Sequence, residues 1–450
     1  MKKEKQDIRF VWVDEFIANV RPYIAVRTED NVLIKRPNVV QKLNSGGAQI
    51  LGGLLSGLSI GSLLKKIGND EQKRNELYLF LIAIKASLED TLDVFTMNPA
   101  VLLKPFEAPF TTLPVLSEVA ITGKCNFRCS FCYAGINNGC SSEGPDLSFD
   151  ELKSIIKKIR YEAKVPSISF TGGEPTLRSD LPELIAFAKS IDMRVNLISN
   201  GFLIDKKLAL DLKNAGLDSA QISIEGCTAE THEKITGVKN SFAHALEAVG
   251  NLKELDIWAH TNTTLSKQNM HETALLPAFL SQELQLKKFS MNLIIPSGTA
   301  SEHDENLLSY SEAGVVIRCI QKEAELNNIE LMWYSPTPLC LFNTITEGLG
   351  NKGCAACDGL VSIDPQGNIL PCSSWNEPVG NLLNQSFSEI WNSPRVEYIR
   401  NKKETPAVCG SCDSFALCQG ACPLFFKHNF CNDELLLKPR FTTTQKTTTI

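Results

Sequence analysis

The sequence lacks the features that indicate a membrane, a secretory route or nucleic acid. Its charged amino terminus, residues 1–10, has no apolar stretch behind it, so no secretory signal is expected. An apolar segment, residues 48–64, is too short and too often interrupted by glycine and serine to span a membrane. The net charge of -6 offers no basic surface to phosphate groups. We therefore expect a cytoplasmic protein that binds neither membrane nor nucleic acid.

Cysteine, in contrast, is abundant. The chain has 15 cysteines in 450 residues, while its 43% hydrophobic and 21% charged residues are ordinary for a globular protein. This length predicts about two to four domains. Since a reducing compartment keeps thiols free, clustered cysteines are candidates for metal ligands.

The first part of the chain, residues 1–98, predicts a small α+β module. Proline at positions 99, 105, 109 and 114 then predicts an extended linker over residues 99–114. Within the module we expect strands at 23–27, 32–36 and 39–43, and helices near 45–56, 59–68 and 71–90.

Residues 115–335 repeat a strand–loop–helix pattern about six times. Such alternation predicts an α/β fold with a parallel sheet and right-handed crossovers, closed or nearly closed into a partial (β/α)6 TIM-type barrel. Its chemistry should lie at the carboxyl ends of the strands. The expected strands are 115–122, 167–171, 195–199, 219–224, 257–264 and 289–295, each followed by a helix such as 149–163.

The segment 336–431 has a different character. It contains nine of the fifteen cysteines and few long periodic runs, which predicts a domain organised by metal. The threonine-rich residues 432–450 predict a disordered tail.

Three cysteines follow the first expected barrel strand as Cys-x3-Cys-x2-Cys. Cys125, Cys129 and Cys132 are close enough in the chain for one loop to wrap them around a metal centre. Thiolate-rich sites favour zinc or iron–sulfur clusters. Zinc would need a fourth nearby ligand, for which Cys140 is a candidate, whereas a four-iron cluster held by three cysteines leaves one iron open.

The run from Cys125 to Tyr133, Cys-Asn-Phe-Arg-Cys-Ser-Phe-Cys-Tyr, resembles the signature loop of the radical S-adenosylmethionine (SAM) superfamily. The resemblance implies that the open iron binds SAM and that one electron cleaves SAM to a 5′-deoxyadenosyl radical. It also implies that the barrel orients this cofactor and excludes water. Tyr133 is counted with the SAM-binding residues.

Further residues resemble the family's SAM-binding positions. Gly172, Gly173 and Glu174 follow the second strand, where glycine permits close backbone approach and the carboxylate could accept from the SAM ammonium. Ser199 and Asn200 end the third strand, and Ser223 ends the fourth.

The chain departs from the family at one SAM-binding position. Thr236 stands where the family often has an arginine for the SAM carboxylate, so that partner is unassigned. We interpret the neighbouring His232 as structural.

The carboxy-terminal cysteines resemble the SPASM domain, which binds two auxiliary four-iron clusters. The resemblance implies that Cys372 and Cys422 share one cluster with an upstream pair. Cys340, Cys354 and Cys357 offer three thiolates for those two places, with Cys354 and Cys357 as our choice. The second cluster would take Cys409, Cys412, Cys418 and Cys431, giving three [4Fe-4S] clusters in all. The alternative is a pair of zinc knuckles. Cys140, Cys227 and Cys319 lie outside every motif and are expected to be buried.

The amino-terminal module resembles the winged-helix-like RiPP recognition element found with peptide-modifying enzymes. The resemblance rests on the order of elements and on the turn Lys42-Leu43-Asn44 before the first helix. It implies that the leader of a precursor peptide adds as a strand to the module's sheet. The alternative is a dimerisation or packing domain.

Together these features predict a radical SAM/SPASM maturase that forms a thioether, a carbon–carbon cross-link or a related oxidation on a ribosomally made peptide. An electron donor such as flavodoxin or ferredoxin is implied. No catalytic acid or base is assigned, because hydrogen abstraction depends on proximity and orientation. Two alternatives are a radical SAM enzyme of tetrapyrrole or other cofactor biosynthesis and a non-catalytic zinc-binding interaction protein.

Overall fold

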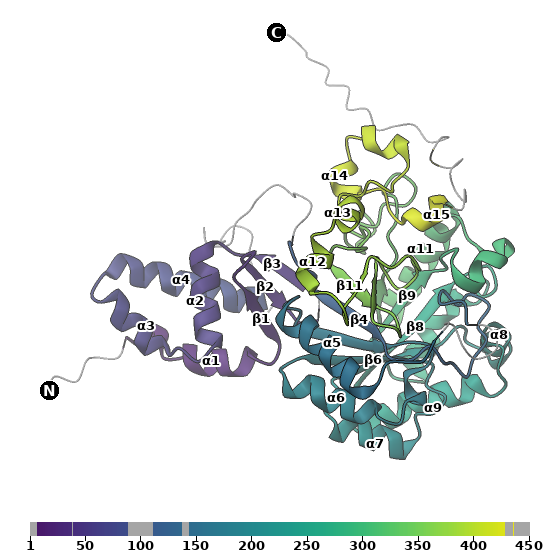
Figure 1. Ribbon diagram of the computed structural model, residues 1–450, viewed down its shortest axis with the longest axis horizontal. Coiled ribbons are helices and arrows are strands. Elements are labelled where there is room, and N and C mark those ends of the chain that lie inside the picture. Colours follow the sequence, from purple (N-terminus) through teal and green to yellow (C-terminus); the bar gives the residue numbers. More distant parts are fainter. Residues whose placement is uncertain (1–6, 38, 89–110, 137–143, 428–434, 436–450) are drawn as a thin grey trace, which may run out of the picture. The chain divides into compact units, whose positions relative to one another are not determined.

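The computed structural model describes residues 7–37, 39–88, 111–136, 144–427 and 435 (Figure 1). The chain divides into two compact units, Met1–Val115 and Leu116–Ile450. Across the described ranges, no helix is both long and apolar enough to cross a membrane.

The amino-terminal unit is a three-stranded antiparallel sheet with helices before and after it. The strand order is β1-β2-β3. The turn before α2 agrees with the sequence expectation, because the Asn44 side chain accepts from the Gly47 N–H at 2.7 Å and caps the helix. The strands are β1 (Ile24–Arg27), β2 (Val32–Lys35) and β3 (Val39–Lys42); the helices are η1 (Ile8–Phe10), α1 (Val13–Val20), α2 (Ser45–Leu55), α3 (Ile60–Ile67) and α4 (Glu71–Leu88), of which α1 was not expected.

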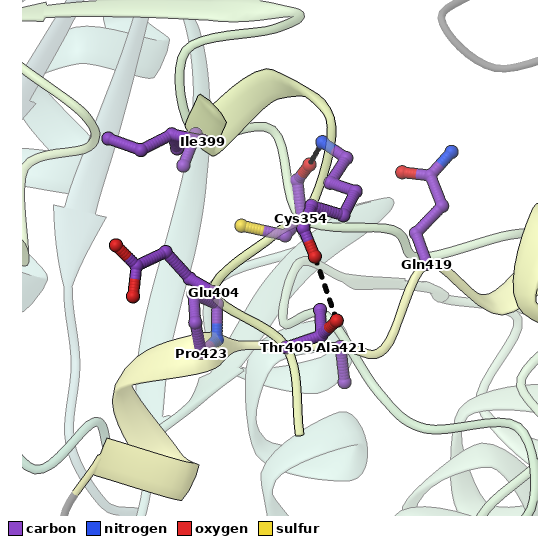
Figure 2. A pocket seen from close by; sticks show the side chains of 9 residues that line it. Cys354, Ile399, Glu404, Thr405, Gln419, Ala421 and Pro423 are labelled. Carbon is purple, nitrogen blue, oxygen red and sulfur yellow. Dashed lines mark hydrogen bonds between the residues drawn. The ribbon is translucent and has the colours of Figure 1, made fainter. Parts of the chain in front are cut away.

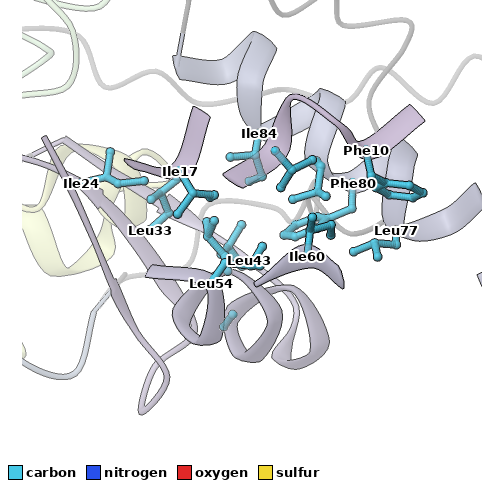
Figure 3. Close-up of a cluster of buried hydrophobic side chains, with 14 residues drawn as sticks. Phe10, Ile17, Ile24, Leu33, Leu43, Leu54, Ile60, Leu77, Phe80 and Ile84 are labelled. Atoms are coloured by element: carbon cyan, nitrogen blue, oxygen red, sulfur yellow. The ribbon is translucent and has the colours of Figure 1, made fainter. Parts of the chain in front are cut away.

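One hydrophobic core holds this unit together. Side chains from the sheet and from all four α-helices meet in it, as Figure 3 shows for Ile17, Leu33, Leu54 and Phe80. Burial of such side chains supplies about 1.5–3 kcal/mol each, before the entropy cost of ordering them. The unit therefore has a core of its own.

The end of the expected linker belongs to the amino-terminal unit. The buried guanidinium of Arg27 donates to the carbonyls of Leu113 and Pro114 at 3.0 and 2.8 Å. It also pairs with the buried Asp30 at 2.7 Å. Residues 99–110 lie outside the described residues, so the extended conformation expected there stays a prediction.

The second unit is built on a ten-stranded sheet. Its order is β10-β9-β8-β7-β6-β5-β4-β11-β12-β13, and the strands from β10 to β11 run parallel. The six expected barrel strands are all present. The strands are β4 (Leu116–Ala120), β5 (Ser167–Thr171), β6 (Arg194–Ser199), β7 (Ser219–Ser223), β8 (Trp258–Leu265), β9 (Lys288–Leu293), β10 (Glu330–Trp333), β11 (Leu360–Ile363), β12 (Asn368–Leu370) and β13 (Gly380–Asn381).

Helices cover the outer face of this sheet, and α9 packs on β7 and β8. Along β4 and β6 buried residues alternate with half-buried ones, which is the period of a strand whose two faces differ. The fully buried face meets the helices. These are α5 (Phe149–Tyr161), α6 (Leu181–Ser190), α7 (Lys206–Asn214), α8 (Ala229–Thr236), α9 (Ser241–Glu254), α10 (Leu276–Gln282) and α11 (Tyr310–Leu326).

The sheet does not close on itself. The free side of β4 pairs with β11, which comes from the cysteine-rich region, with Glu118 opposite Ser362. The fold is thus a partial barrel, and the cysteine-rich region continues its sheet. The remaining helices of that region are α12 (Phe387–Trp391), α13 (Pro394–Arg400), η7 (Ala407–Ser411), α14 (Phe415–Cys418) and α15 (Pro423–Lys427).

Candidate functional site

The loop with Cys125, Cys129 and Cys132 follows β4 at the carboxyl end of the sheet. Neighbouring segments hold its backbone: the N–H groups of Arg128 and Ser130 donate to the end of α8 at 3.0 Å each. The Ser130 hydroxyl also donates to Gln268 at 2.7 Å. The loop is therefore positioned by tertiary contacts as well as by its own turns.

The three thiols of this loop interact with one another. Burial raises the pKa of Cys125 to about 11, and the charges of Glu174 and Cys132 add to this. Burial also raises the pKa of Cys129, with further contributions from Cys132, Glu225 and Cys125. Because thiolates are the metal-binding form, a metal centre here must displace protons. Three converging thiols fit a four-iron cluster with one open iron.

The two glycines after β5 lie directly against the cysteine loop. Gly172 has φ +148°, and a Cβ there would stand 2.4 Å from the Thr122 carbonyl oxygen. A Cβ on Gly173 would stand 2.1 Å from the Lys124 carbonyl oxygen. The Gly173 N–H donates to Thr122 at 2.8 Å. Only glycine permits this approach, which agrees with the interpretation of the motif.

Glu174 organises the ends of β5 and β6. Its buried carboxylate accepts from the N–H and hydroxyl of Thr176 at 3.0 and 2.6 Å, from the Ser199 hydroxyl at 2.8 Å and from the Asn200 N–H at 2.8 Å. Asn200 in turn donates to Asn126 of the cysteine loop at 2.8 Å. Three of these donors share one carboxylate oxygen, whereas the other oxygen accepts only from Asn200, so that oxygen keeps an acceptor site that a SAM ammonium could use.

The structure brings together Glu174, Ser199 and Asn200 of the predicted SAM-binding residues. Ser223 ends β7 opposite Asn262 of β8. Tyr133 follows the last cysteine of the loop, and burial, then the charge of Glu118, raise the pKa of its hydroxyl.

The two residues of the divergent segment are buried. The Nδ1 atom of His232 accepts from the Glu225 N–H at 3.1 Å. The Thr236 hydroxyl hydrogen bonds to Ser241 at 2.8 Å. Both contacts agree with structural roles.

Gly298 was missed by the sequence interpretation. It follows β9 with φ +55°, and a Cβ there would lie 2.3 Å from the Cys132 carbonyl oxygen. The next residue, Thr299, donates its N–H to the same oxygen at 2.9 Å. The Pro-Ser-Gly turn after the last barrel strand was the available signal. This turn packs onto the cysteine loop.

Four cysteines of the carboxy-terminal region form a first auxiliary set: Cys354, Cys357, Cys372 and Cys422. Burial raises the pKa of Cys372, and Cys354 and Cys422 are close enough to add to the effect. Burial likewise raises the pKa of Cys422 and Cys357 to about 12 each, with Cys354 contributing to both. The Cys357 N–H donates to Pro371 at 3.0 Å, which ties the two segments together.

A second auxiliary set contains Cys409, Cys412 and Cys418, and Cys340 lies beside it. Burial raises the pKa of Cys409 to about 11, with contributions from Cys418, Cys340 and Cys412 in that order. The Leu339 N–H donates to the Cys418 sulfur at 3.4 Å. The structure thus places Cys340 with this set rather than with Cys354. Cys431, expected as a ligand here, lies outside the described residues.

Neither of the two described cysteines outside the motifs is fully buried, as both were expected to be. Cys319 is exposed, so the expectation that it is buried was wrong: it lies on α11, whose buried stripe it does not join. Cys227 is half-buried and Cys140 lies outside the described residues. Among the described residues, no group of three or more His, Cys, Asp or Glu is arranged for a single metal ion.

Glu118 links the barrel to the first auxiliary set, and the sequence interpretation did not include it. Its carboxylate accepts from the Ser373 hydroxyl, beside Cys372. Burial raises the pKa of Glu118, whose charge acts on both Tyr133 and Cys372. The available signal was an acidic residue in the middle of the apolar strand β4.

Two family models match this chain. The model of the Radical SAM superfamily matches residues 119–276, and the model of the SPASM family, an iron–sulfur cluster-binding domain, matches residues 354–413. The first range contains the cysteine loop and the glycine motif, and the second contains the first three thiols of the first auxiliary set.

Curated relatives of two kinds are similar to this chain. An AdoMet-dependent heme synthase of Methanosarcina barkeri is 27% identical over 69% of this chain and 91% of its own length. The Fe-coproporphyrin III synthase of the same organism is 29% identical over 66% of this chain and 79% of its own. A PqqA peptide cyclase of Granulibacter bethesdensis is 27% identical over 67% of this chain and 80% of its own.

Solved structures support the fold. Streptococcus suis SuiB bound to the precursor peptide SuiA superposes with a TM-score of 0.68 at 16% identity, over 90% of this chain and 95% of that one. AnSMEcpe with bound AdoMet superposes with a TM-score of 0.55 at 18% identity, over 72% and 94%. The fold, the cysteine loop and the family matches define a radical SAM enzyme. More particularly, it is a radical SAM enzyme in which a SPASM extension follows the barrel, and this favours an enzyme over the alternative of a non-catalytic zinc protein.

Proposed function

We propose that this radical SAM/SPASM enzyme modifies a ribosomally synthesised peptide, forming a thioether, a carbon–carbon cross-link or a related oxidation. In this proposal Cys125, Cys129 and Cys132 hold a four-iron cluster that binds SAM, and the two auxiliary sets hold one cluster each. Cys431 completes the second set. When bound, the first cluster and SAM supply a 5′-deoxyadenosyl radical that abstracts hydrogen.

The residues of the chain orient SAM. Gly172 and Gly173 bring the backbone close to the cysteine loop, while Ser199, Asn200 and Ser223 offer polar groups at neighbouring strand ends. The acidic and hydroxyl groups of Glu118 and Ser373 face each other beside the first auxiliary set. Because free thiols need a reducing compartment, the proposal includes a cytoplasmic location and an electron donor such as flavodoxin or ferredoxin.

The observation that carries the peptide proposal is the outer strand of the amino-terminal sheet. Within the part of the chain that the structure describes, β3 pairs on one side only, with β2. The Leu43 N–H points to the β2 side, donating to Asn31 at 2.8 Å. Since N–H groups alternate along an antiparallel strand, that of Val40 points away from β2, to the side where a leader peptide could add as a further strand. The SuiB–peptide structure, which superposes on 90% of this chain, supports the proposal.

A tetrapyrrole substrate is the second candidate. It is favoured by the heme synthase and Fe-coproporphyrin III synthase relatives, each of which aligns with about two thirds of this chain. A tetrapyrrole needs no strand edge for binding, so the two candidates differ in what they require of β3.

The first experiment tests the radical chemistry. The protein is purified without oxygen, reconstituted with iron and sulfide, and assayed for iron and for 5′-deoxyadenosine released from SAM under reductant. We expect about twelve irons per chain, the sum for three four-iron clusters, and no 5′-deoxyadenosine from Cys125→Ala. Full clusters without 5′-deoxyadenosine, or zinc in place of iron, would contradict the proposal.

The second experiment distinguishes peptide from tetrapyrrole. Val40→Pro removes an outward N–H from β3, while Val40→Ala removes most of the side chain and keeps that N–H. Binding of synthetic peptides encoded beside the gene should be lost in the proline variant and kept in the alanine variant. Binding and turnover of iron-coproporphyrin III, with no peptide bound by the wild type, would favour the tetrapyrrole candidate.

A further inference from the structure

Two cations at the end of α13 hold the backbone of the first auxiliary set. The Arg400 guanidinium donates to the Cys357 carbonyl oxygen at 2.9 Å, and also to the Trp391 carbonyl oxygen at 2.7 Å. Two residues further on, the Lys402 ammonium donates to the Cys354 carbonyl oxygen at 2.6 Å. The backbone carbonyls of Cys354 and Cys357 thus each accept a hydrogen bond from a cation of the segment 400–402.

Lys402 is an unusual lysine. Its side chain is only 8% exposed, and its backbone has φ +57°, a conformation that costs energy in a residue with a Cβ. Its ammonium pairs with Asp358 at 3.0 Å, and its carbonyl accepts from the Thr405 hydroxyl at 2.8 Å. A buried charge is expensive unless it is paired, so this fold maintains the lysine at a cost.

Lys402 and Cys354 lie at the same small recess. Both residues line a small recess together with Glu404, Thr405 and Gln419, and Figure 2 shows the Cys354 side chain at this recess. Burial raises the pKa of Cys354 and of Cys357, and the positive charge of Lys402 opposes that effect at both thiols. The ammonium is therefore close enough to act electrostatically on two of the four thiols.

We propose that Lys402 is a positioning residue of the first auxiliary site, which fixes the Cys354 loop and compensates the negative charge of an iron–sulfur cluster held by the four thiolates. This inference rests on the proposed function, because it requires the cluster. A nearby positive charge favours the reduced cluster, so Lys402 raises its reduction potential. Asp358, the counter-ion of Lys402, has the opposite effect.

The test is a reduction-potential titration of the reconstituted full chain, followed by electron paramagnetic resonance. The signal of the first auxiliary site is identified by its loss in Cys372→Ala. In Lys402→Met this signal should titrate at a more negative potential, and in Asp358→Asn at a more positive one. Lys402→Arg keeps the charge and should stay near the wild type. Lys403→Met, at the exposed neighbouring lysine, is the matched control and should not shift.

Opposite shifts in Lys402→Met and Asp358→Asn support the inference, because damage to the fold would not give opposite signs. An unshifted potential in both variants, or the same shift in Lys403→Met as in Lys402→Met, would overturn it. If Lys402→Met holds about eight irons instead of about twelve and Lys402→Arg restores the rest, the positioning role is supported. A wild-type protein that lacks clusters would refute the proposed function instead.

Discussion

Replacing Glu174 by glutamine tests how the end of β5 supports SAM binding. The two side chains have nearly the same shape, but an amide accepts at one end only. In the structure one carboxylate oxygen accepts from the Asn200 N–H, and the other from the Thr176 N–H and from two hydroxyls. Hydroxyls can turn to accept, whereas a backbone N–H cannot. In either orientation, the NH2 group of the glutamine therefore faces a backbone N–H, that of Asn200 or that of Thr176, and leaves it without an acceptor.

The expected cost follows from that count. Losing one hydrogen bond to a charged acceptor costs about 1.5–3 kcal/mol, and the unsatisfied N–H lies at Asn200 or at Thr176. The hydrogen bond proposed from the SAM ammonium also loses its charged acceptor, at a similar cost of about 1.5–3 kcal/mol, so SAM should bind about 10- to 100-fold more weakly, since 1.4 kcal/mol is a factor of ten.

The assay is equilibrium binding of SAM to the reconstituted protein, with 5′-deoxyadenosine release measured in parallel. Glu183→Gln, at an exposed position on α6, is the control for the loss of one negative charge. A Glu174→Gln protein that binds SAM as tightly as the wild type would refute the reasoning.

Three further predictions concern the rest of the chain. Gly173→Ala forces a Cβ to within 2.1 Å of the Lys124 carbonyl oxygen, an overpacking cost of about 1–3 kcal/mol, and should lower the iron retained at the cysteine loop. Asp30→Asn leaves Arg27 buried without its counter-ion and should destabilise the amino-terminal unit by about 3–5 kcal/mol in a urea titration. Burial lowers the pKa of His232 to about 4 from 6.5, so the folded state favours neutral imidazole. His232 should therefore contribute a loss of stability of up to about 3 kcal/mol as the pH drops from about 6.5 to about 4, and the fall should be smaller in His232→Gln.

The sequence predicted those parts of the fold and site that depend on neighbours in the chain. The six barrel strands were visible as apolar runs followed by helices. The cysteine loop was recognisable because its three thiols lie within eight residues, which one loop can gather. Gly172 and Gly173 were also recognisable locally, since a tight turn directly after a strand often requires glycine.

Other features were missed or left open, because they depend on tertiary packing or lie in short elements. Spacing offered Cys340 as an alternative to Cys354 or Cys357 in the first auxiliary set, whereas the contact of Leu339 with Cys418 and the influence of Cys340 on Cys409 place it beside the second set. The short helix α1 was missed although Val13 and Ile17, four residues apart, mark a buried helix face. The exposure of Cys319 depends on the side of α11 that faces the sheet.

The sequence by itself determined the class of chemistry, because the cysteine loop is a local motif whose ligands are set by spacing. The tertiary structure alone decided how the auxiliary region joins the barrel. Glu118 and Ser373 are 255 residues apart, and they meet because β11 pairs with the free side of β4. Lys402 reaches Cys354 across 48 residues in the same way. Such contacts follow from strand register and packing, which are cooperative properties of the whole fold and leave no mark on the spacing of residues in the chain.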